Sequence, residues 1–257
     1  MPQPNRRALL GPDWTLETRA LVAAMTVPPA GARVAQIDTL IKSLKAADVW
    51  RLLDVLYLLA AHDSQAARLN WKSPGAFTLS PFNAPTFLAD RGYTGDGVTA
   101  YIDTGYNPGD GGNHNLKRDS AFAAIWTRTE IVDPVSGFDF GGGDIAIGPF
   151  GSSKTAYFTR LNSGSLSVPL VGNANFYSCS RSNANNYDVY QGASLLTTHN
   201  LASSAVVDSS LTFFKRNGAS AFTSNQISVG MAGAALTAAQ IAALYAALAI
   251  YMAALGA

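Results

Sequence analysis

The stretch that decides the fold is residues 154–191, KTAYFTRLNSGSLSVPLVGNANFYSCSRSNANNYDVYQ. It contains four short runs rich in aromatic and β-branched residues, at 154–161, 165–171, 175–181 and 187–191. Such residues favour strands, whereas Asn162, Ser163 and Gly164 between the first two runs are typical of a tight hairpin turn. Asn and Gly suit that turn because they tolerate a positive φ. The stretch therefore predicts successive antiparallel strands.

The same pattern continues on both sides of this stretch. Further candidate strands lie at 76–79, 100–103, 121–132, 138–140, 211–216 and 226–229, and Asn217-Gly218 marks another turn. About ten short strands with turn signals between them are typical of a sandwich or barrel. We therefore expect a mainly β fold, an antiparallel jelly-roll β-sandwich.

The chain before Trp71 has helical periodicity instead. Residues 15–25 predict a short helix capped by Thr15, and apolar residues spaced three or four apart between 34 and 44 predict a helix after Gly31. Another helix is expected from Asp48, because residues 49–59 are apolar on most of a helical circumference. The predicted division is an N-terminal helical segment over residues 1–70, serving attachment or oligomerisation, and a sandwich over residues 71–257.

A C-terminal helix of about 18 residues is expected after Leu236. Thr237 and Gln240 stand at the spacing of a capping box, in which each side chain bonds the backbone N–H of the other. The apolar stretch 236–256 is long enough to span a bilayer, but alanine dominates it and no Lys or Arg flanks it. We therefore favour an amphipathic helix docked on the sandwich over a membrane span.

Charge and cysteine content exclude several classes of protein. The 18 basic and 17 acidic residues leave no positive excess for gripping phosphates, so we expect no nucleic-acid partner. Charged residues make up only 14% of the chain, which suits a protein whose surface is partly buried in an assembly of many copies. The single cysteine, Cys179, excludes an intrachain disulfide and a multi-cysteine metal site.

The residues that catalysis would need do not form a recognisable set. The triplet Asp103-Thr104-Gly105 occurs once, so we interpret it as a strand that ends in a turn, with Asp103 accepting local backbone hydrogen bonds. The three histidines are not spaced as metal ligands. The sequence also shows no third group that would orient a histidine as the partner of a nucleophilic Cys179. We therefore expect no enzyme, no catalytic residues and no cofactor.

Calcium is the one metal that the sequence leaves open. An oxygen-rich loop with interspersed glycines carries Asp103, Asn107, Asp110, Asn113 and Asn115. Carboxylate and amide oxygens are the ligands that Ca²⁺ prefers, but the spacing fits no EF-hand. A turn-rich loop without metal is the favoured interpretation.

A glycan-binding rim is the candidate site. Sugar recognition needs an exposed aromatic ring for the apolar sugar face and planar amides for the hydroxyls. Both occur in one short stretch, in the residues Asn183, Asn185, Asn186, Tyr187 and Tyr190. Asn and Tyr also populate loops and strands for backbone reasons, so a purely structural role is the alternative.

Longer strings resemble one family of domains. DRGYTGDG at 90–97 and AYIDTGYNP at 100–108 resemble the opening of concanavalin A-like (laminin-G type) jelly-roll domains in phage and prophage proteins. DVYQGASL at 188–195, ISVG at 227–230 and LTAAQIAALY at 236–245 resemble a hairpin, the last strand and the terminal helix of that family. Residues 53–63 and 66–71 resemble a block that precedes the domain in prophage proteins.

The resemblance implies a bacteriophage virion structural protein, a decoration, fibre or tail-associated component. It would be made in the host cytoplasm and assembled in the particle as a homo-oligomer, with a trimer as one arrangement. Its expected partners are other virion proteins and a host surface glycan, without nucleic acid or a membrane span. Many domains of the family bind calcium at the sandwich rim, but this sequence has no matching acidic cluster. The alternatives are a glycan-binding adhesin and, less favoured, a glycan depolymerase with two facing carboxylates.

Overall fold

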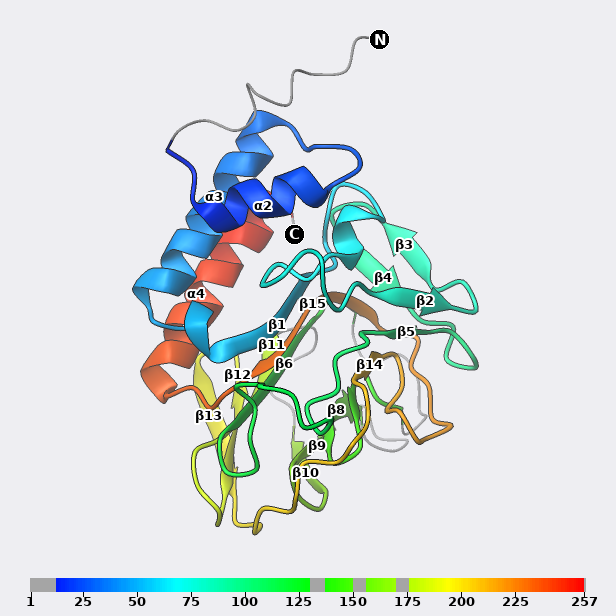
Figure 1. The fold of residues 1–257 in the computed structure, drawn as a ribbon. Helices are drawn as coiled ribbons and strands as arrows, with labels where there is room; N and C mark the ends of the chain where they lie inside the picture. The colour runs from blue at the N-terminus through cyan, green and yellow to red at the C-terminus, as the bar shows by residue number, and fades with distance from the viewer. Residues whose placement is uncertain (1–12, 130–136, 150–155, 170–175, 257) are drawn as a thin grey trace.

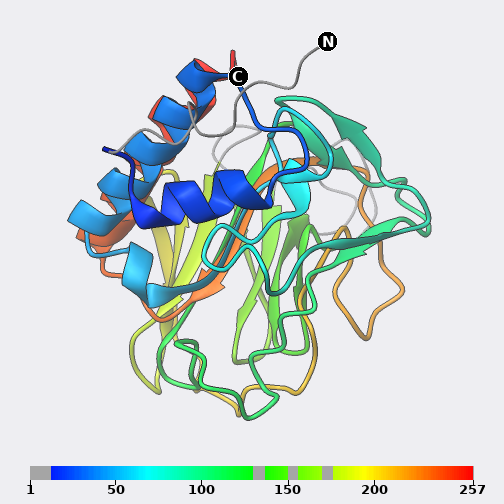
Figure 2. The same cartoon turned by 45° about the horizontal axis from the view of Figure 1, so that its top comes forward.

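The fold is a sandwich of two antiparallel sheets with a layer of helices outside one of them (Figures 1 and 2). The computed structural model describes residues 13–129, 137–149, 156–169 and 176–256. The expected mainly β, antiparallel sandwich is confirmed, and so is the helix at its C-terminal end.

The first sheet has eight strands, of which seven follow one another in a path of hydrogen-bonded neighbours. In spatial order these are β13 (Ser194–His199), β12 (Tyr187–Gln191), β11 (Phe176–Arg181), β6 (Ala121–Thr127), β15 (Gln226–Gly233), β4 (Gly92–Thr94) and β3 (Thr86–Leu88). The eighth, β1 (Leu53–Leu58), pairs with the C-terminal part of β15, whereas β4 pairs with its first two residues. Two short strands thus share one edge of β15.

The second sheet has seven strands and packs face to face with the first. In spatial order these are β10 (Leu166–Pro169), β9 (Ala156–Leu161), β8 (Ile145–Pro149), β7 (Phe140–Gly142), β14 (Thr212–Phe213), β5 (Tyr101–Asp103) and β2 (Ser80–Phe82). The sequence-based strand predictions are therefore confirmed for most of the sandwich, but they missed β1, β2, β3, β4, β8 and β13. Residues 76–79, expected as a strand, precede β2.

The core between the sheets is built from aromatic rings. Tyr157 of β9 stacks on Tyr177 of β11 with ring centroids 4.2 Å apart, and Phe213 of β14 meets Tyr57 of β1 edge to face at 5.9 Å. Phe213 also lies directly over Gly230 of β15, where a Cβ atom would stand 2.3 Å from its ring. Gly230 is therefore required by close packing between the sheets.

The helices form an outer layer over the first sheet. The helices α3 (Gly31–Ala46) and α4 (Ala238–Ala254) lie side by side, and α2 (Leu16–Ala24) packs on α3 (Figures 1 and 2). Both expected caps are present, since the Thr15 side chain accepts from the N–H of Thr18 and Thr237 forms a capping box with Gln240. Within the described residues, no helix combines the length and apolarity that a bilayer span requires.

The helix expected from Asp48 is wrong. Asp48 adopts a φ of 58° in place of an N-cap conformation, a short 3-10 helix η1 (Trp50–Leu52) follows, and residues 53–58 form β1. Apart from Asp54, the residues of β1 are apolar because β1 is buried on both faces, between the helical layer and the second sheet. Residues 53–58 therefore lie in the sandwich, although they precede the predicted boundary at residue 70.

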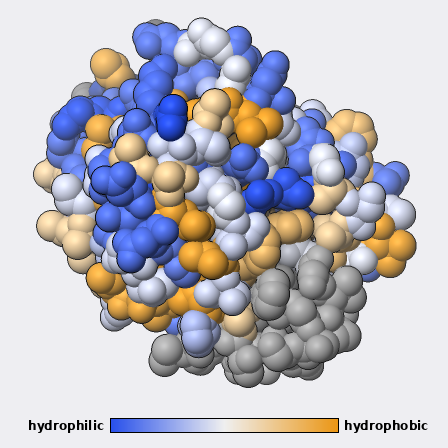
Figure 3. Space-filling model, turned by 90° about the horizontal axis from the view of Figure 1, so that it is seen from below, coloured by the Kyte–Doolittle hydropathy of each residue, from blue (hydrophilic) through white to orange (hydrophobic). Residues whose placement is uncertain are grey.

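The surface mixes apolar and polar side chains without a single apolar face in view. Exposed large hydrophobic residues belong to separate elements, among them Leu16 of α2, Phe82 of β2, Leu195 of β13 and Ile250 of α4. Figure 3 shows hydrophobic side chains in several separate groups among hydrophilic ones. Scattered exposed apolar residues of this kind are ordinary on folded proteins.

The contact between Gly230 and Phe213 predicts a large effect of one methyl group. We expect Gly230→Ala to lower the free energy of unfolding by about 1–3 kcal/mol, because the ring has to move within a packed core. Urea unfolding followed by tryptophan fluorescence measures this loss. Gly164→Ala is the matched control, since a Cβ atom there meets nothing within 4 Å. An equal effect of the two substitutions would contradict the packing argument.

Asp139 predicts how stability depends on pH. Its buried carboxylate accepts from the Tyr157 hydroxyl at 2.8 Å and the Asn225 amide at 2.9 Å, and burial raises its pKa from 3.8 to about 6. The folded state therefore retains a proton up to a higher pH than the unfolded state, so stability falls as pH rises from about 4 to 6. A pKa shift of one unit corresponds to about 1.4 kcal/mol. The raised pKa of Asp139 therefore lowers the free energy of unfolding by roughly 3 kcal/mol at neutral pH, where the carboxyl is ionised.

Asp139→Asn should remove this pH dependence. An asparagine oxygen can still accept from Asn225, and its NH₂ group can donate to the Tyr157 hydroxyl, so both contacts remain hydrogen-bonded, the one to Tyr157 with its direction reversed. We expect the variant to be at least as stable as the natural chain at pH 7 and to lose the decline between pH 4 and 6. Urea unfolding at a series of pH values tests this, and an unchanged slope would refute it.

Candidate functional site

The predicted glycan-binding rim lies in the loop between β11 and β12 and in β12 itself. Asn183 and Asn185 are exposed, but Asn183 uses its side-chain oxygen to accept from the N–H groups of Asn185 and Asn186 at 2.8 and 3.1 Å. Its NH₂ group donates to the side-chain oxygen of Asn186 at 3.0 Å. These amides thus hold the loop in its turn.

The two tyrosines of the rim are buried, which is a correction to the sequence argument. Tyr187 is 1% exposed, and its hydroxyl donates to the Thr159 carbonyl at 3.0 Å between the sheets. Tyr190 is 4% exposed, and its hydroxyl lies 3.4 Å from the Asp188 carboxylate. The exposed ring that sugar stacking needs is therefore not supplied by Tyr187 or Tyr190, because both positions of β12 point into packed layers.

Arg181 explains why this loop has a defined shape. Its guanidinium is completely buried and donates to the carbonyls of Leu161, Asn183, Asn186 and Leu201 at 2.8–3.3 Å. Burial lowers its pKa, but the four carbonyl oxygens satisfy its donors. The arginine is thus a structural clamp on the rim and does not face a ligand.

The other residues considered for chemistry have local structural roles. Asp103 accepts from the N–H of Gly105 at 2.9 Å, as predicted for a strand that ends in a turn. Cys179 is buried in β11, and burial raises the pKa of its thiol, so it is a poor nucleophile. Burial also lowers the pKa of His199, whose ring packs edge-on against Tyr187 at 5.1 Å.

In the oxygen-rich loop after Asp103, the side chains form hydrogen bonds within the protein. Asn107 accepts from the N–H groups of Gly109 and Ser209, and Asp110 accepts from the N–H of Gly112 and the His114 ring. Across the parts of the chain that the structure describes, no three His, Cys, Asp or Glu side chains are grouped as metal ligands. Calcium binding at this loop stays the less favoured alternative of the sequence analysis, and nothing in the structure tests it.

The sequence analysis missed a pocket between α4 and the end of the first sheet. We call it the Trp126–Tyr245 pocket, and it has a volume of about 320 Å³. Its lining comes from the start of β4, the end of β6 and the second half of α4, and consists of Arg91, Trp126, Thr127, Arg128, Tyr245, Ala249, Met252 and Ala253. Pockets of roughly 300 Å³ and more are in the range of small-molecule sites.

An aromatic pair forms one wall of this pocket. Trp126 of β6 and Phe176 of β11 are direct cross-strand partners, and Tyr245 of α4 stacks on Trp126 at 5.7 Å with an angle of 18° between the rings. Gly192 in the turn after β12, with a φ of 58°, leaves room for the Tyr245 ring, which a Cβ atom would approach to 3.3 Å. Trp126 and Tyr245 are both half-buried, so each ring keeps an accessible part.

Two arginines give the pocket its charge. Arg91 directly precedes β4 and is exposed, whereas Arg128 directly follows β6 and is half-buried, and β15 lies between these two strands. Within residues 13–129, 137–149, 156–169 and 176–256, no ion pair or hydrogen bond engages either guanidinium. Burial and, to a smaller extent, the charge of Arg91 lower the pKa of Arg128.

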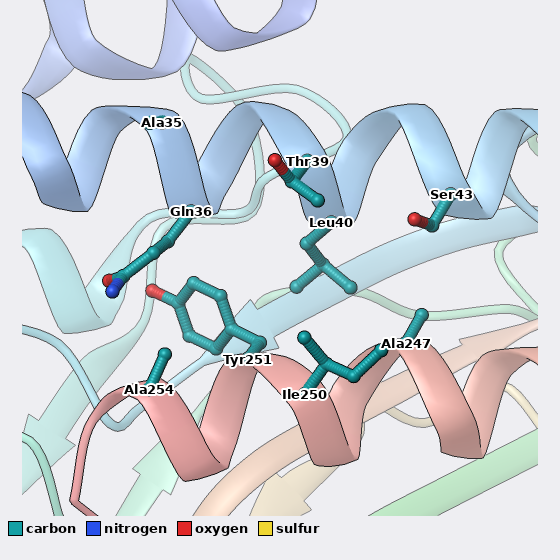
Figure 4. A pocket seen from close by; sticks show the side chains of 9 residues that line it. All are labelled: Ala35, Gln36, Thr39, Leu40, Ser43, Ala247, Ile250, Tyr251 and Ala254. Carbon is teal, nitrogen blue, oxygen red and sulfur yellow. The ribbon is translucent and has the colours of Figure 1, made fainter.

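A second hollow lies between α3 and α4 (Figure 4). Small side chains, Ala35 of α3 and Ala247 and Ala254 of α4, leave this space open, and the Tyr251 ring lies between the two helices. The described side chains that line it carry hydroxyl and amide groups but no charge. We therefore regard the Trp126–Tyr245 pocket as the stronger candidate site, because it combines accessible rings with charged donors.

No protein-family model and no curated protein matches the chain. Among solved structures, a botulinum neurotoxin type C, described as depending on two ganglioside molecules to enter cells, has a TM-score of 0.55 at 11% identity. The match covers 79% of this chain and 53% of that one. The binding domain of botulinum neurotoxin serotype D has a TM-score of 0.53 at 8% identity, with 78% and 52% covered.

The chain thus spans about half the length of these neurotoxin chains. At such low identity the similarity concerns the fold alone. It agrees with the observed β-sandwich, and the function has to be argued from the site.

Proposed function

We propose that the chain is a glycan-binding module and that the Trp126–Tyr245 pocket is its binding site. The observation that carries this proposal is the stacked, half-buried ring pair in an open pocket beside two arginine side chains. The C–H face of a sugar ring is apolar and packs on an aromatic ring, while its hydroxyls need hydrogen-bond donors and acceptors. The guanidinium groups of Arg91 and Arg128 offer such donors.

The rigidity of the ring pair supports this function. Trp126 contacts Phe176 at 6.0 Å as well as Tyr245, so three rings from β6, β11 and α4 hold one another in place. A ring that is already fixed loses little conformational freedom when a ligand binds, which favours affinity.

The similar structures support the same class of function. The neurotoxin type C structure is described as interacting with two ganglioside molecules, which are sugar-bearing lipids. That interaction belongs to the neurotoxin. For this chain it supports the proposal of a sandwich that presents a glycan site.

The pocket supports binding more than hydrolysis. Glycoside hydrolysis by the usual route needs a pair of carboxylates, and the described residues that line the pocket include no Asp, Glu or His. We therefore keep the proposal of a non-catalytic module. The virion role, the virion partners, the homo-oligomer and the location in a phage particle stay predictions from the sequence resemblance.

Tyr245→Ala tests the proposal. We expect the natural chain to bind oligosaccharides on a glycan array and Tyr245→Ala to weaken the best hit at least about tenfold in calorimetric titration, a loss of about 1.4 kcal/mol. Tyr245→Phe should retain binding, because it keeps the ring.

Ile250→Ala is the control on the same helix, since Ile250 is 69% exposed and lines the hollow between α3 and α4. It should leave affinity unchanged. Thermal unfolding of each variant confirms that it is folded. A natural chain that binds no glycan, or a Tyr245→Ala variant that binds as well as the natural chain, would refute the proposal.

A further inference from the structure

We infer that the Trp126–Tyr245 pocket selects a sugar that carries a carboxylate over a neutral sugar of the same size. This inference rests on the proposed function and specifies its ligand class. It is carried by the two arginines of the pocket, which form no ion pair with any residue that the structure describes.

The arginines of the pocket differ from other cationic residues of the chain. Ion pairs join Arg33 to Asp90, Lys45 to Glu17 and Arg160 to Asp144 at 2.6–3.2 Å. Arg181 and Arg216 donate to backbone carbonyls and form no ion pair within the described ranges. Arg91 and Arg128 have neither kind of partner in the described part of the chain.

The fold places these two like charges against the same hollow. Arg128 stands two residues after Trp126, and the N–H of Arg128 donates to the Gln226 carbonyl of β15, which holds the backbone at this point. Arg91 is fixed from the other side of β15, since its carbonyl accepts from the Ser228 hydroxyl at 2.8 Å. Both side chains then line the pocket under the second half of α4.

The charge of this arrangement is only partly offset by the protein. The last turn of α4, which contributes Met252 and Ala253, carries the partial negative charge of a helix C-terminus, equivalent to about half an elementary charge. Two full positive charges face it. Burial and, to a smaller extent, the charge of Arg91 lower the pKa of the half-buried Arg128, because desolvation and a like charge both disfavour its charged form.

An anion in the pocket would relieve this cost. A carboxylate accepts two parallel hydrogen bonds from a planar guanidinium, and such charge-assisted bonds are stronger than bonds between neutral groups. The adjacent rings of Trp126 and Tyr245 require that the same ligand also has an apolar face. A carboxylated pyranose, either a uronic acid or a sialic acid, combines both properties.

Paired titrations of the full chain test this inference. Affinities are measured by calorimetry for sialyllactose against lactose and for trigalacturonate against galactotriose, which distinguishes the two sources of a sugar carboxylate. We expect at least about a tenfold preference for one of the acidic members, and a preference that shrinks as salt rises because the charges are accessible to solvent.

Arg91→Gln and Arg128→Gln should each weaken binding of the acidic sugar far more than binding of the neutral sugar, and so remove most of this preference. Arg51→Gln is the matched control, because Arg51 lies outside the pocket and pairs with Asp48 on the surface. It should leave the preference intact. Thermal unfolding again excludes misfolded variants.

The outcomes separate the two proposals. A natural chain that binds neutral and acidic sugars equally, or arginine variants that keep the full preference, would overturn the charge selection and leave glycan binding standing. Binding of neither acidic nor neutral sugars would overturn the glycan-binding proposal itself.

Discussion

The sandwich depends on the complete burial of β15. Its residues pair with β6 along one edge and with β4 and then β1 along the other, and all but the first are buried. A central strand of this kind needs small side chains where the opposite sheet approaches closely. Gly230 meets this need by giving the Phe213 ring a place against the backbone. The segment QISVGMAG, with no charged residue, is suited to that position.

The candidate pocket is a consequence of how the strands around β15 end. β6 ends at Thr127 under the second half of α4, so Trp126 still contacts Tyr245 whereas Arg128 already lies beyond the sheet. On the other side of β15, β4 begins only at Gly92, which leaves Arg91 at the same opening. The ring wall and the two charges thus come from strand ends that a helix covers, and the sheet beneath supplies rigidity.

Function and fold are separate questions in this molecule. Neurotoxin chains with identities of 8–11% have a similar sandwich. This similarity supports the architecture but does not identify a ligand. The site is informative about function because charged residues make up only 14% of the chain. Among the described residues, the neighbouring Arg91 and Arg128 have neither an ion pair nor a hydrogen bond at their guanidinium groups, and a ligand is a physical reason for keeping them.

What the sequence alone determined are the features that depend on neighbouring residues: the caps at Thr15 and Thr237, the periodic helices α3 and α4, and most strands of the sandwich. It could not determine that residues 53–58 form a strand, because an apolar run fits a buried helix and a buried strand equally well. It also could not show that the Tyr187 ring is buried. The pocket was decided by tertiary structure alone, since Arg91, Trp126 and Tyr245 meet only after β4, β6 and α4 have packed around β15.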